Sequence, residues 1–388
     1  MSSVFKAITQ AVDEYAAAEQ LASNLLLQQG QSTLGFVVFF CAADYDLPRL
    51  AKAMQQSFGD IPLVGCTSSG EISPQGYSEH SIVAIGFAST EFQLASVCIT
   101  ELDQFDLLKA QQVVTQLKRQ LHAVAGQASD DHTFDHECLV MTLLDGLSAQ
   151  EELVLLALES ALGPIAHFGG SAGDNHQLRR THLYFQGQFY SNAAVLLMVR
   201  THLPFAVFST SHLQHGAEKL VVTAASVQSR VVYELNAEPA AQAYADLLGL
   251  TVAELNPTVF ALHPLAVRIG QEYYIRAIQK VNADLSLTFY CAMANGMVLT
   301  AMKPDDLIFN LAEQLQNLSS QLGEPLLTIG CDCVLRKLEV DQLQLAKPAQ
   351  ALFARFNVVG FNTYGEHFNG VHLNQTFTGV MFAKAKTW

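Results

Sequence analysis

Apolar residues follow two spacings along the chain, one typical of helices and one typical of buried strands. Residues 8–28 place apolar side chains at helical intervals, whereas the run from Leu34 to Ala42 is apolar almost throughout. Such short continuous runs predict strands buried on both faces. The whole pattern predicts helices at about 8–28, 47–58, 104–123, 145–162, 238–248, 305–321 and 349–355, and strands at about 34–42, 81–87, 92–100, 138–144, 182–186, 193–199, 204–209, 230–234, 273–280, 285–291 and 326–334.

One glycine turn recurs between these elements. The first copy reads Gly65-Cys66-Thr-Ser-Ser-Gly70-Glu71, and the second reads Gly360-Phe-Asn-Thr-Tyr364-Gly365-Glu366. The match continues without a gap to Ser81 with Thr376 and to Phe87 with Phe382. A weaker third version over residues 165–174 is one residue shorter and ends in Asp174. Glycine at both ends of the turn indicates positive φ or a close approach of two backbones.

Repetition at this wide separation predicts duplicated domains, because the units of a solenoid recur every 20–50 residues or so. Each turn follows a helix and a short apolar run, so the predicted unit is strand, helix, strand, glycine turn with an acid, and strand. We expect a mixed α/β fold of the α+β type, with internally repeated mixed sheets covered by helices. We expect an N-terminal helix at 1–30 and two domains at 31–225 and 226–388.

The acids of the turns allow two interpretations. Glu71 and Glu366 could simply accept hydrogen bonds from the N–H groups of their own turns. Alternatively, the three turns could line shared ligand pockets. On this second interpretation the candidate pocket residues are Gly65, Cys66, Gly70, Glu71, Gly365 and Glu366.

Composition excludes several classes of partner. Of the 388 residues half are apolar and 15% are charged, and the formal net charge is −15. An acidic protein is a poor ligand for nucleic acid or for an anionic membrane surface. The N-terminus lacks a signal-peptide pattern and no apolar run approaches the roughly 18 residues of a membrane span, so we expect a cytoplasmic protein. Seven scattered cysteines fit reduced, buried thiols better than a disulfide framework.

Two familiar motifs are present only in part. Gly65 to Gly70 has the glycine spacing of a phosphate-binding loop, but Glu71 stands where lysine is required. Gly169-Gly-Ser171-Ala-Gly173 matches the nucleophile elbow of hydrolases, yet no helical pattern follows it. We therefore expect no enzymatic activity, and keep a serine hydrolase using Ser171 as an alternative.

The histidines provide candidate ligands for a metal. His367 takes the place that apolar Ile72 holds in the first turn, so an imidazole has replaced an aliphatic side chain. His263, in an apolar run before Pro264, and His167, beside the third turn, are further candidates. A haem iron needs one such nitrogen within an apolar cavity, and Tyr364 is an alternative ligand.

Five segments, in this order, resemble the FIST sensory proteins: residues 65–71, residues 168–174, His263-Pro-Leu-Ala-Val with Tyr274-Ile-Arg276, Cys333-Val-Leu-Arg336 and residues 360–366. The resemblance covers an N-terminal FIST domain at about 31–225 and a C-terminal one at 226–383. FIST domains are similar to bacterial sensors of small ligands, often fused to kinases, cyclases or chemotaxis modules. In this resemblance Arg276 and Tyr364 are candidates to line the pocket.

Stand-alone proteins of this length in the family resemble haem-binding nitric oxide sensors. The resemblance implies a non-covalent haem b, nitric oxide as the ligand, and regulation of a separate histidine kinase in a two-component system; a homo-oligomer is possible. We take His367 as the metal ligand from the comparison of the turns. Two alternatives stay open: a sensor of a non-haem ligand such as an amino acid, with Arg276 pairing its carboxylate, and the hydrolase.

Overall fold

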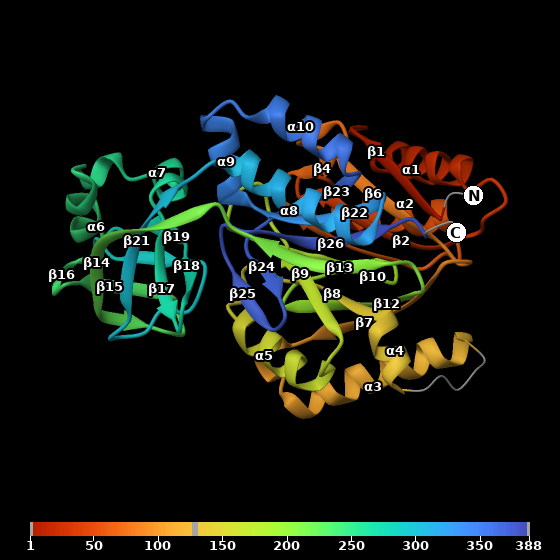
Figure 1. The fold of residues 1–388 in the computed structure, drawn as a ribbon, viewed down its shortest axis with the longest axis horizontal. Helices are drawn as coiled ribbons and strands as arrows, with labels where there is room; N and C mark the ends of the chain where they lie inside the picture. The colour runs from red at the N-terminus through yellow and green to blue at the C-terminus, as the bar shows by residue number, and fades with distance from the viewer. Residues whose placement is uncertain (1–2, 126–130, 386–388) are drawn as a thin grey trace.

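The computed structural model describes residues 3–125 and 131–385, and it contains three copies of one chain path (Figure 1). Each copy runs strand, helix, strand, helix, strand, β-hairpin, strand. The first consists of β1 (Val4–Thr9), α1 (Glu14–Gln28), β2 (Leu34–Ala42), α2 (Leu47–Phe58), β3 (Leu63–Ser68), the hairpin β4 (Glu71–Ser73) and β5 (Gly76–Ser78), and β6 (Ile82–Ala88). Asp13 and Asp46 cap the two helices by accepting backbone N–H hydrogen bonds at their N-termini.

The other two copies follow the same order. The second consists of β7 (Phe92–Thr100), α3 (Leu107–Ala125), the short α4 (Asp131–Glu137), β8 (Cys138–Leu144), α5 (Glu151–Leu162), β9 (Ala166–Ser171), the hairpin β10 (Leu183–Phe185) and β11 (Gln188–Tyr190), and β12 (Ala193–Thr201). The third consists of β13 (Phe205–Thr210), α8 (Leu307–Leu322), β22 (Pro325–Cys333), α9 (Val334–Gln342), α10 (Ala346–Arg355), β23 (Val358–Thr363), the hairpin β24 (Glu366–Phe368) and β25 (Val371–Leu373), and β26 (Phe377–Ala383).

A further domain is inserted into the third copy between β13 and α8, and it lies to one side of the body in Figure 1. Its strands form one eight-stranded sheet in the order β18-β17-β21-β14-β15-β20-β19, with β16 paired to β15. It consists of β14 (Leu213–Ser226), β15 (Val231–Leu235), β16 (Glu238–Pro239), α6 (Ala240–Leu248), α7 (Pro257–Leu262), β17 (Leu265–Ile269), β18 (Glu272–Arg276), β19 (Ile278–Val281), β20 (Leu287–Phe289) and β21 (Val298–Pro304).

The three copies interlock because each gives its hairpin to the sheet of another. Strand β4 pairs with β23 of the third copy, β10 pairs with β3 of the first, and β24 pairs with β9 of the second. Each six-stranded sheet therefore contains four strands of one copy and two of the next: β1-β6-β2-β3-β10-β11, β7-β12-β8-β9-β24-β25 and β13-β26-β22-β23-β4-β5. Helices α2, α5 and α10 contact the hairpin strands β11, β25 and β5, which are the sheet edges.

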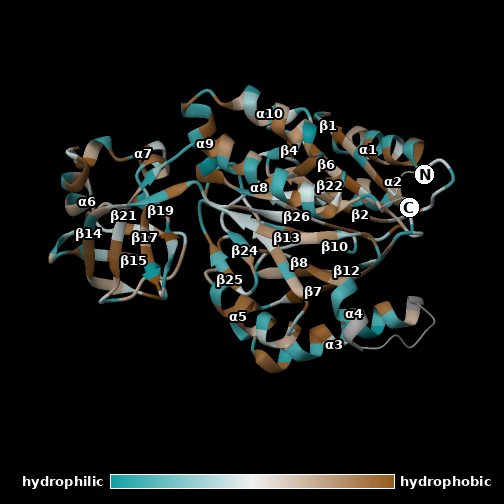
Figure 2. Ribbon diagram, viewed as in Figure 1, coloured by the Kyte–Doolittle hydropathy of each residue, from teal (hydrophilic) through white to brown (hydrophobic). Residues whose placement is uncertain are grey.

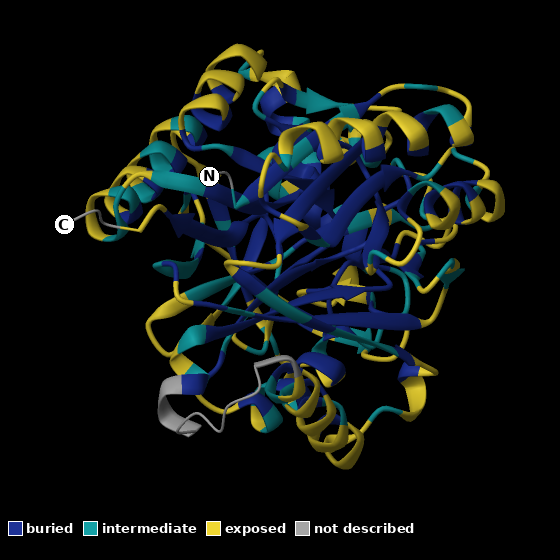
Figure 3. Cartoon of the chain, turned by 90° about the vertical axis from the view of Figure 1, so that its right-hand side faces the viewer, coloured by how far each residue is buried: buried dark blue, intermediate teal, exposed yellow. Residues whose placement is uncertain are grey.

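The sheets share one apolar core, with the helices outside it. The central strands are buried, whereas the helices expose their outer faces (Figure 3), and brown apolar residues follow the strands in Figure 2. Phe40 of the first copy stacks on Phe361 of the third with ring centroids 4.3 Å apart. Phe92 of the second copy contacts Phe382 of the third at 5.5 Å. The core is therefore built between copies.

The expected fold class is confirmed, and the differences are local. The helix predicted from residue 8 begins at Glu14, because residues 4–9 form β1, which pairs with β6. In the polar segment 126–137, residues 131–137 are helical, and 126–130 lie outside the described residues. The strand expected at 273–280 is divided at Ala277. Residue 225, the expected domain boundary, lies in β14. In the described part of the chain, every helix is too short or too polar to cross a membrane.

Loss of the aromatic stack between two copies should destabilise the whole body. We expect Phe361→Ala to lower the free energy of unfolding by about 3–5 kcal/mol, the usual cost of removing a buried phenylalanine. Urea denaturation followed by circular dichroism measures this change. Phe309→Ala is the control, since Phe309 is 65% exposed; equal effects of the two substitutions would contradict the interlocked core.

Candidate functional site

The three glycine turns meet at the ends of β3, β9 and β23 and are hydrogen-bonded to one another. The N–H of Ser69 donates to the carbonyl of Asn362 at 3.0 Å, which joins the first copy to the third. The N–H of Gly173 donates to Thr67 at 3.1 Å, and that of Ser171 donates to Gly365 at 2.8 Å, which joins the remaining pairs of copies. The turns therefore form a closed ring around the point where the copies meet.

The weaker third turn places its acid at the same distance from the strand end as the other two, although the hairpin after it begins only at Leu183. In the structure each six-residue strand is followed, three residues after its end, by an acid: Glu71, Asp174 or Glu366. The prediction that the third turn is one residue shorter is therefore wrong. The distance from the strand end to the acid is the same in all three turns, and Gly173 is the glycine before the acid in the third. A Cβ atom at this glycine would lie 2.3 Å from Oγ of Ser69. Glycine is required here because two turns touch at that point.

The two glutamates are structural acceptors in the core. Glu71 accepts hydrogen bonds from the hydroxyls of Ser68 and Ser81. Glu366 accepts from the hydroxyl of Thr363 and from both the N–H and the hydroxyl of Thr376, at 3.1 and 2.9 Å. Both side chains are fully buried. Each carboxyl thus holds its own turn to the strand that follows the exchanged hairpin.

Burial changes the protonation of these acids. Desolvation raises the pKa of Glu71 to about 7 and that of Glu366 to about 8, although the surrounding hydroxyl groups oppose the shift. The predicted donors, the N–H groups of the turns themselves, are not the partners found: the donors are hydroxyl groups of the turns and residues Ser81 and Thr376 beyond them. Asp174 differs, since it accepts from the N–H groups of Leu178 and Arg179 and from the hydroxyl of Tyr364.

Above the ring lies a cavity of about 370 Å³ that all three copies line. The first copy supplies Asp44, Ser69, Glu79 and His80, the second supplies Asn175, His176 and Gln177, and the third supplies Lys337, Leu338 and Asp341. The cavity opens at the carboxyl ends of parallel strand pairs, where α/β sheets commonly bind ligands. Its lining is polar and carries both signs of charge.

Lys337 is the central cation of this cavity. Its ammonium group pairs with Asp341, lies 3.7 Å from a carboxylate oxygen of Glu79 and stands 5.5 Å over the ring of Tyr77. The side chain is 10% exposed, so these partners hold it against the wall. In the same lining, burial lowers the pKa of His176. A bound carboxylate could therefore replace one of the acids around Lys337.

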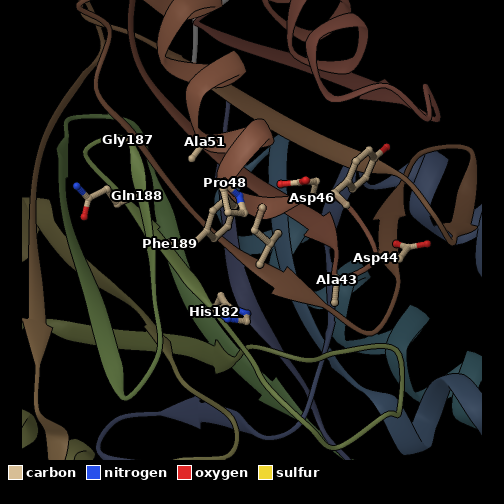
Figure 4. A pocket seen from close by; sticks show the side chains of 11 residues that line it. Ala43, Asp44, Asp46, Pro48, Ala51, His182, Gly187, Gln188 and Phe189 are labelled. Carbon is tan, nitrogen blue, oxygen red and sulfur yellow. The ribbon is translucent and has the colours of Figure 1, made fainter.

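A second cavity of about 810 Å³ adjoins the first, and Asp44 lines both (Figure 4). Figure 4 shows its lining by the end of β2, the start of α2, and His182 and Phe189. It therefore lies between the first copy and the hairpin of the second. Asp44 also contacts the imidazole of His80, and this hydrogen bond raises the pKa of His80.

The predicted turn residues form the floor beneath the cavity and do not line it. Gly65, Cys66, Gly70, Glu71, Gly365 and Glu366 are all buried. Sequence reasoning missed Asp44, His176 and Lys337. Their shared signal is position, since each follows a strand of one copy by two to five residues. Aligning the copies at all strand ends, instead of at the glycines alone, would have selected them.

His367, the first choice of metal ligand, lies in the core. Its Nε2 is 3.0 Å from Oγ of Ser171, and its Nδ1 has no hydrogen-bond partner. Desolvation and the neighbouring His372 and His167 lower the pKa of His367 well below its usual value. The imidazole is neutral and fully buried in the strand β24. A haem does not fit there unless the hairpin opens, because Gly365 and His372 are already in close contact.

The other candidate ligands lie in different places. His167 is fully buried and hydrogen-bonded to Thr142, and Tyr364 is buried against Asp174. His263 ends α7 in the inserted domain and has an exposed side chain. Burial of part of its ring lowers its pKa, so the imidazole is neutral and can bind a metal. Within the described residues, no group of three or more His, Cys, Asp or Glu side chains could hold a metal ion.

Arg276 lies at the end of β18, outside the lining of the polar cavity. Its Nε is buried without a hydrogen-bond partner, and its charge acts on the thiol of Cys291. The next residue, Ala277, donates its N–H to Asn374 of the body at 3.4 Å. Arg276 therefore belongs to the junction between the inserted domain and the body.

That junction also contains a buried ion cluster. Arg230 of the inserted domain pairs with Glu151, at 2.6 Å, and with Glu152, both at the start of α5. Glu152 accepts the N–H of Ala292 at 2.8 Å and lies 3.5 Å from His372. Burial alone would raise the pKa of Glu152, but the nearby His372 and the charge of Arg230 outweigh this desolvation and lower it. The inserted domain is thus fixed to the second copy by charge.

Ser171 and His367 form a serine–histidine pair without access to substrate. Both side chains are fully buried, and the chain continues from Ser171 into the turn rather than into a helix. A nucleophile needs a base that is itself oriented by a third group. Among the described residues, Nδ1 of His367 has no such hydrogen-bond partner.

Comparisons with known proteins identify two sequence families in this chain. The FIST N domain model matches residues 35–238, and the FIST C domain model matches residues 240–369. The uncharacterized protein MJ1623 of Methanocaldococcus jannaschii is 23% identical over 373 residues, covering 87% of this chain and 70% of that protein. The crystal structure of cyanuric acid hydrolase from A. caulinodans aligns over both whole chains with 10% identity and a TM-score of 0.34, too low to support any argument.

The buried acids predict a measurable dependence of stability on pH. Because the folded pKa of Glu366 is raised to about 8 from 4.5, its contribution is complete below pH 4.5 and is lost as the pH rises to about 8. Within this window one such group changes the free energy of unfolding by about 1.4 kcal/mol per pH unit. We expect Glu366→Gln, which imitates the protonated acid, to lower the slope by this amount and to leave the contribution that Glu71 makes below about pH 7.

Urea denaturation between pH 5 and about 8 measures the slope, because in this range the folded and unfolded chains differ in the number of bound protons. Glu19→Gln, at an exposed position of α1, is the matched control and should follow the unmodified protein. An unchanged slope in Glu366→Gln would show that this carboxyl is already ionised in the folded state.

Proposed function

Because this chain belongs to the FIST family, we propose that it is a sensor that binds a small polar ligand above the three glycine turns and regulates a separate signalling protein. FIST domains are sensor domains of signal transduction that bind small ligands. We propose that the regulated protein is a histidine kinase and that this chain acts in the cytoplasm. The proposal assigns no reaction to the protein.

The observation that carries this proposal is the cavity of about 370 Å³ with its lining from all three copies. A ligand placed there touches Ser69, His176 and Lys337 at once. It can therefore favour one arrangement of the copies over another, and a ligand shifts a conformational equilibrium only through such differential contacts. The turns beneath would transmit the shift, since they are hydrogen-bonded in a ring.

The chemistry of the lining favours a ligand that carries both charges. Lys337 supplies a cation for a carboxylate, and Asp44, Glu79 and Asp341 supply anions for an ammonium group. Ser69 and Asn175 add uncharged hydrogen-bonding groups. An amino acid meets these requirements, and its ammonium and carboxylate would replace the ion pairs that the lining side chains make with one another.

A haem-based nitric oxide sensor is the second candidate, and the exposed, neutral imidazole of His263 favours it. A haem b bound there would supply the iron that takes up nitric oxide. The chain itself would supply one nitrogen ligand and the apolar residues beside it on α7, Val259 and Leu262, both partly buried.

The first test is thermal denaturation with a panel of free amino acids. We expect at least one to raise Tm, because a ligand at 100 times its Kd stabilises a protein by about 2.7 kcal/mol. Lys337→Gln should abolish the increase, whereas Lys347→Gln, at an exposed position of α10, should retain it. No response to any amino acid, or an equal response of both variants, would contradict a zwitterion at this cavity.

The second test is an absorption spectrum of protein produced with a haem precursor, recorded in the ferrous state before and after nitric oxide. For the haem candidate we expect a stoichiometric Soret band that shifts with nitric oxide and is lost in His263→Ala. Loss of the Soret band in His367→Ala, but not in His263→Ala, would identify His367 as the haem ligand, as predicted from the sequence. Protein without haem would eliminate this candidate and leave the polar cavity.

A further inference from the structure

The cavity of about 810 Å³ beside the charged cavity has no role in holding the ammonium and carboxylate of a zwitterion. Asp44 lines both cavities, so the two meet at this side chain. The rest of the lining comes from residues between 43 and 51 of the first copy and between 182 and 189 of the second. The second cavity is therefore the place open to the side chain of a ligand whose carboxylate is held at Lys337.

One wall of this second cavity is apolar. It is formed by Leu47, Pro48, Ala51 and Phe189 (Figure 4). The ring of Phe189 makes edge contacts with the rings of Phe39 and Tyr184, with centroids 6.4 and 5.3 Å apart. These contacts fix the ring, yet Phe189 is only partly buried and can contact a ligand. A hydrocarbon chain on this wall gains about 25 cal/mol for each Å² of apolar surface removed from water.

The charged side chains that line the second cavity are both acids. Figure 4 shows Asp44 and Asp46 toward the same side of the lining. Oδ1 of Asp46 caps α2 by accepting the N–H of Arg49 at 3.1 Å, and Oδ2 of Asp44 contacts His80. Among the described residues, the other oxygen of each carboxylate has no hydrogen-bond partner. His80 can compensate the charge of Asp44 alone, which leaves the charge of Asp46 to a ligand.

The basic groups nearest to these acids do not supply a cation to the cavity. The guanidinium of Arg49 pairs with Asp13 and Glu14 instead, at 3.0 and 3.3 Å. His182 lines the cavity, and burial lowers the pKa of its imidazole, which is therefore neutral. Its Nδ1 is buried and has no hydrogen-bond partner within the described part of the chain. The cavity thus attracts a positively charged group and repels a negatively charged one.

We propose that the two cavities form one site for a basic amino acid, an inference that rests on the zwitterionic ligand proposed above. The α-carboxylate pairs with Lys337, and the α-ammonium pairs with Asp44, where the cavities meet. The methylene chain lies on the apolar wall and the terminal cation beside Asp46, since long basic side chains bury their stems and keep their charge among polar groups. The side chain then contacts the first and second copies together.

Isothermal titration calorimetry of the full chain with L-lysine and L-norleucine tests this proposal, because norleucine has the carbon chain of lysine without the terminal ammonium. We expect lysine to bind at least about tenfold more tightly than norleucine, and L-glutamate to bind more weakly than both. Asp46→Asn should reduce the preference for lysine to less than about threefold. Asparagine caps helices as well as aspartate does, so this variant should stay folded, which circular dichroism verifies.

Asp306→Asn is the matched control, because Asp306 caps α8 in the same way and lies outside the lining of both cavities. It should keep the preference for lysine. A preference that survives Asp46→Asn, or equal binding of lysine, norleucine and glutamate, would overturn the basic ligand. If lysine fails to bind while another amino acid raises Tm through Lys337, this inference alone is wrong; if no amino acid binds, the proposed sensor of a zwitterion is wrong as well.

Discussion

The exchange of β-hairpins between the three copies is the constraint on which the rest of the structure depends. The glycine before each acid allows the chain to leave its sheet: Gly70 has a positive φ of 128°, and a Cβ atom at Gly173 or Gly365 would lie no more than 2.3 Å from a neighbouring side chain. The backbone groups at the strand ends would be buried without partners if the turns did not bond to one another. The bonds from Ser69, Ser171 and Gly173 satisfy them and close the ring.

Burial of acids at this ring has thermodynamic consequences beyond geometry. A carboxyl in the core is favourable only when it is protonated or hydrogen-bonded, and the pKa values of Glu71 and Glu366 are raised into the neutral range. The cavity with Lys337 lies directly above, so ligand charge and turn protonation act on the same group of strands.

The inserted domain is attached through a different kind of contact. Arg230, Glu151 and Glu152 form a buried ion cluster, in which removal of one partner would leave an uncompensated charge. Tyr290 of the domain lies 5.7 Å from Tyr364, which in turn donates to Asp174 beside the ring. A change at the turns can therefore reach this domain through a chain of contacting side chains.

The sequence by itself determined the elements and two of the turns, because apolar spacing and glycine position are local properties of the chain. It also indicated the family, through five short segments in order. It could not show that Asp174 stands at the same distance from its strand end as the two glutamates, that the hairpins are exchanged, or that His367 lies sealed in the core beside Ser171. Strand exchange joins residues about 120–290 positions apart, from Cys66 with Leu183 to Ile72 with Gly360. Pairing over such separations depends on the packing of whole sheets, and therefore only the tertiary structure decided where the charged cavity lies.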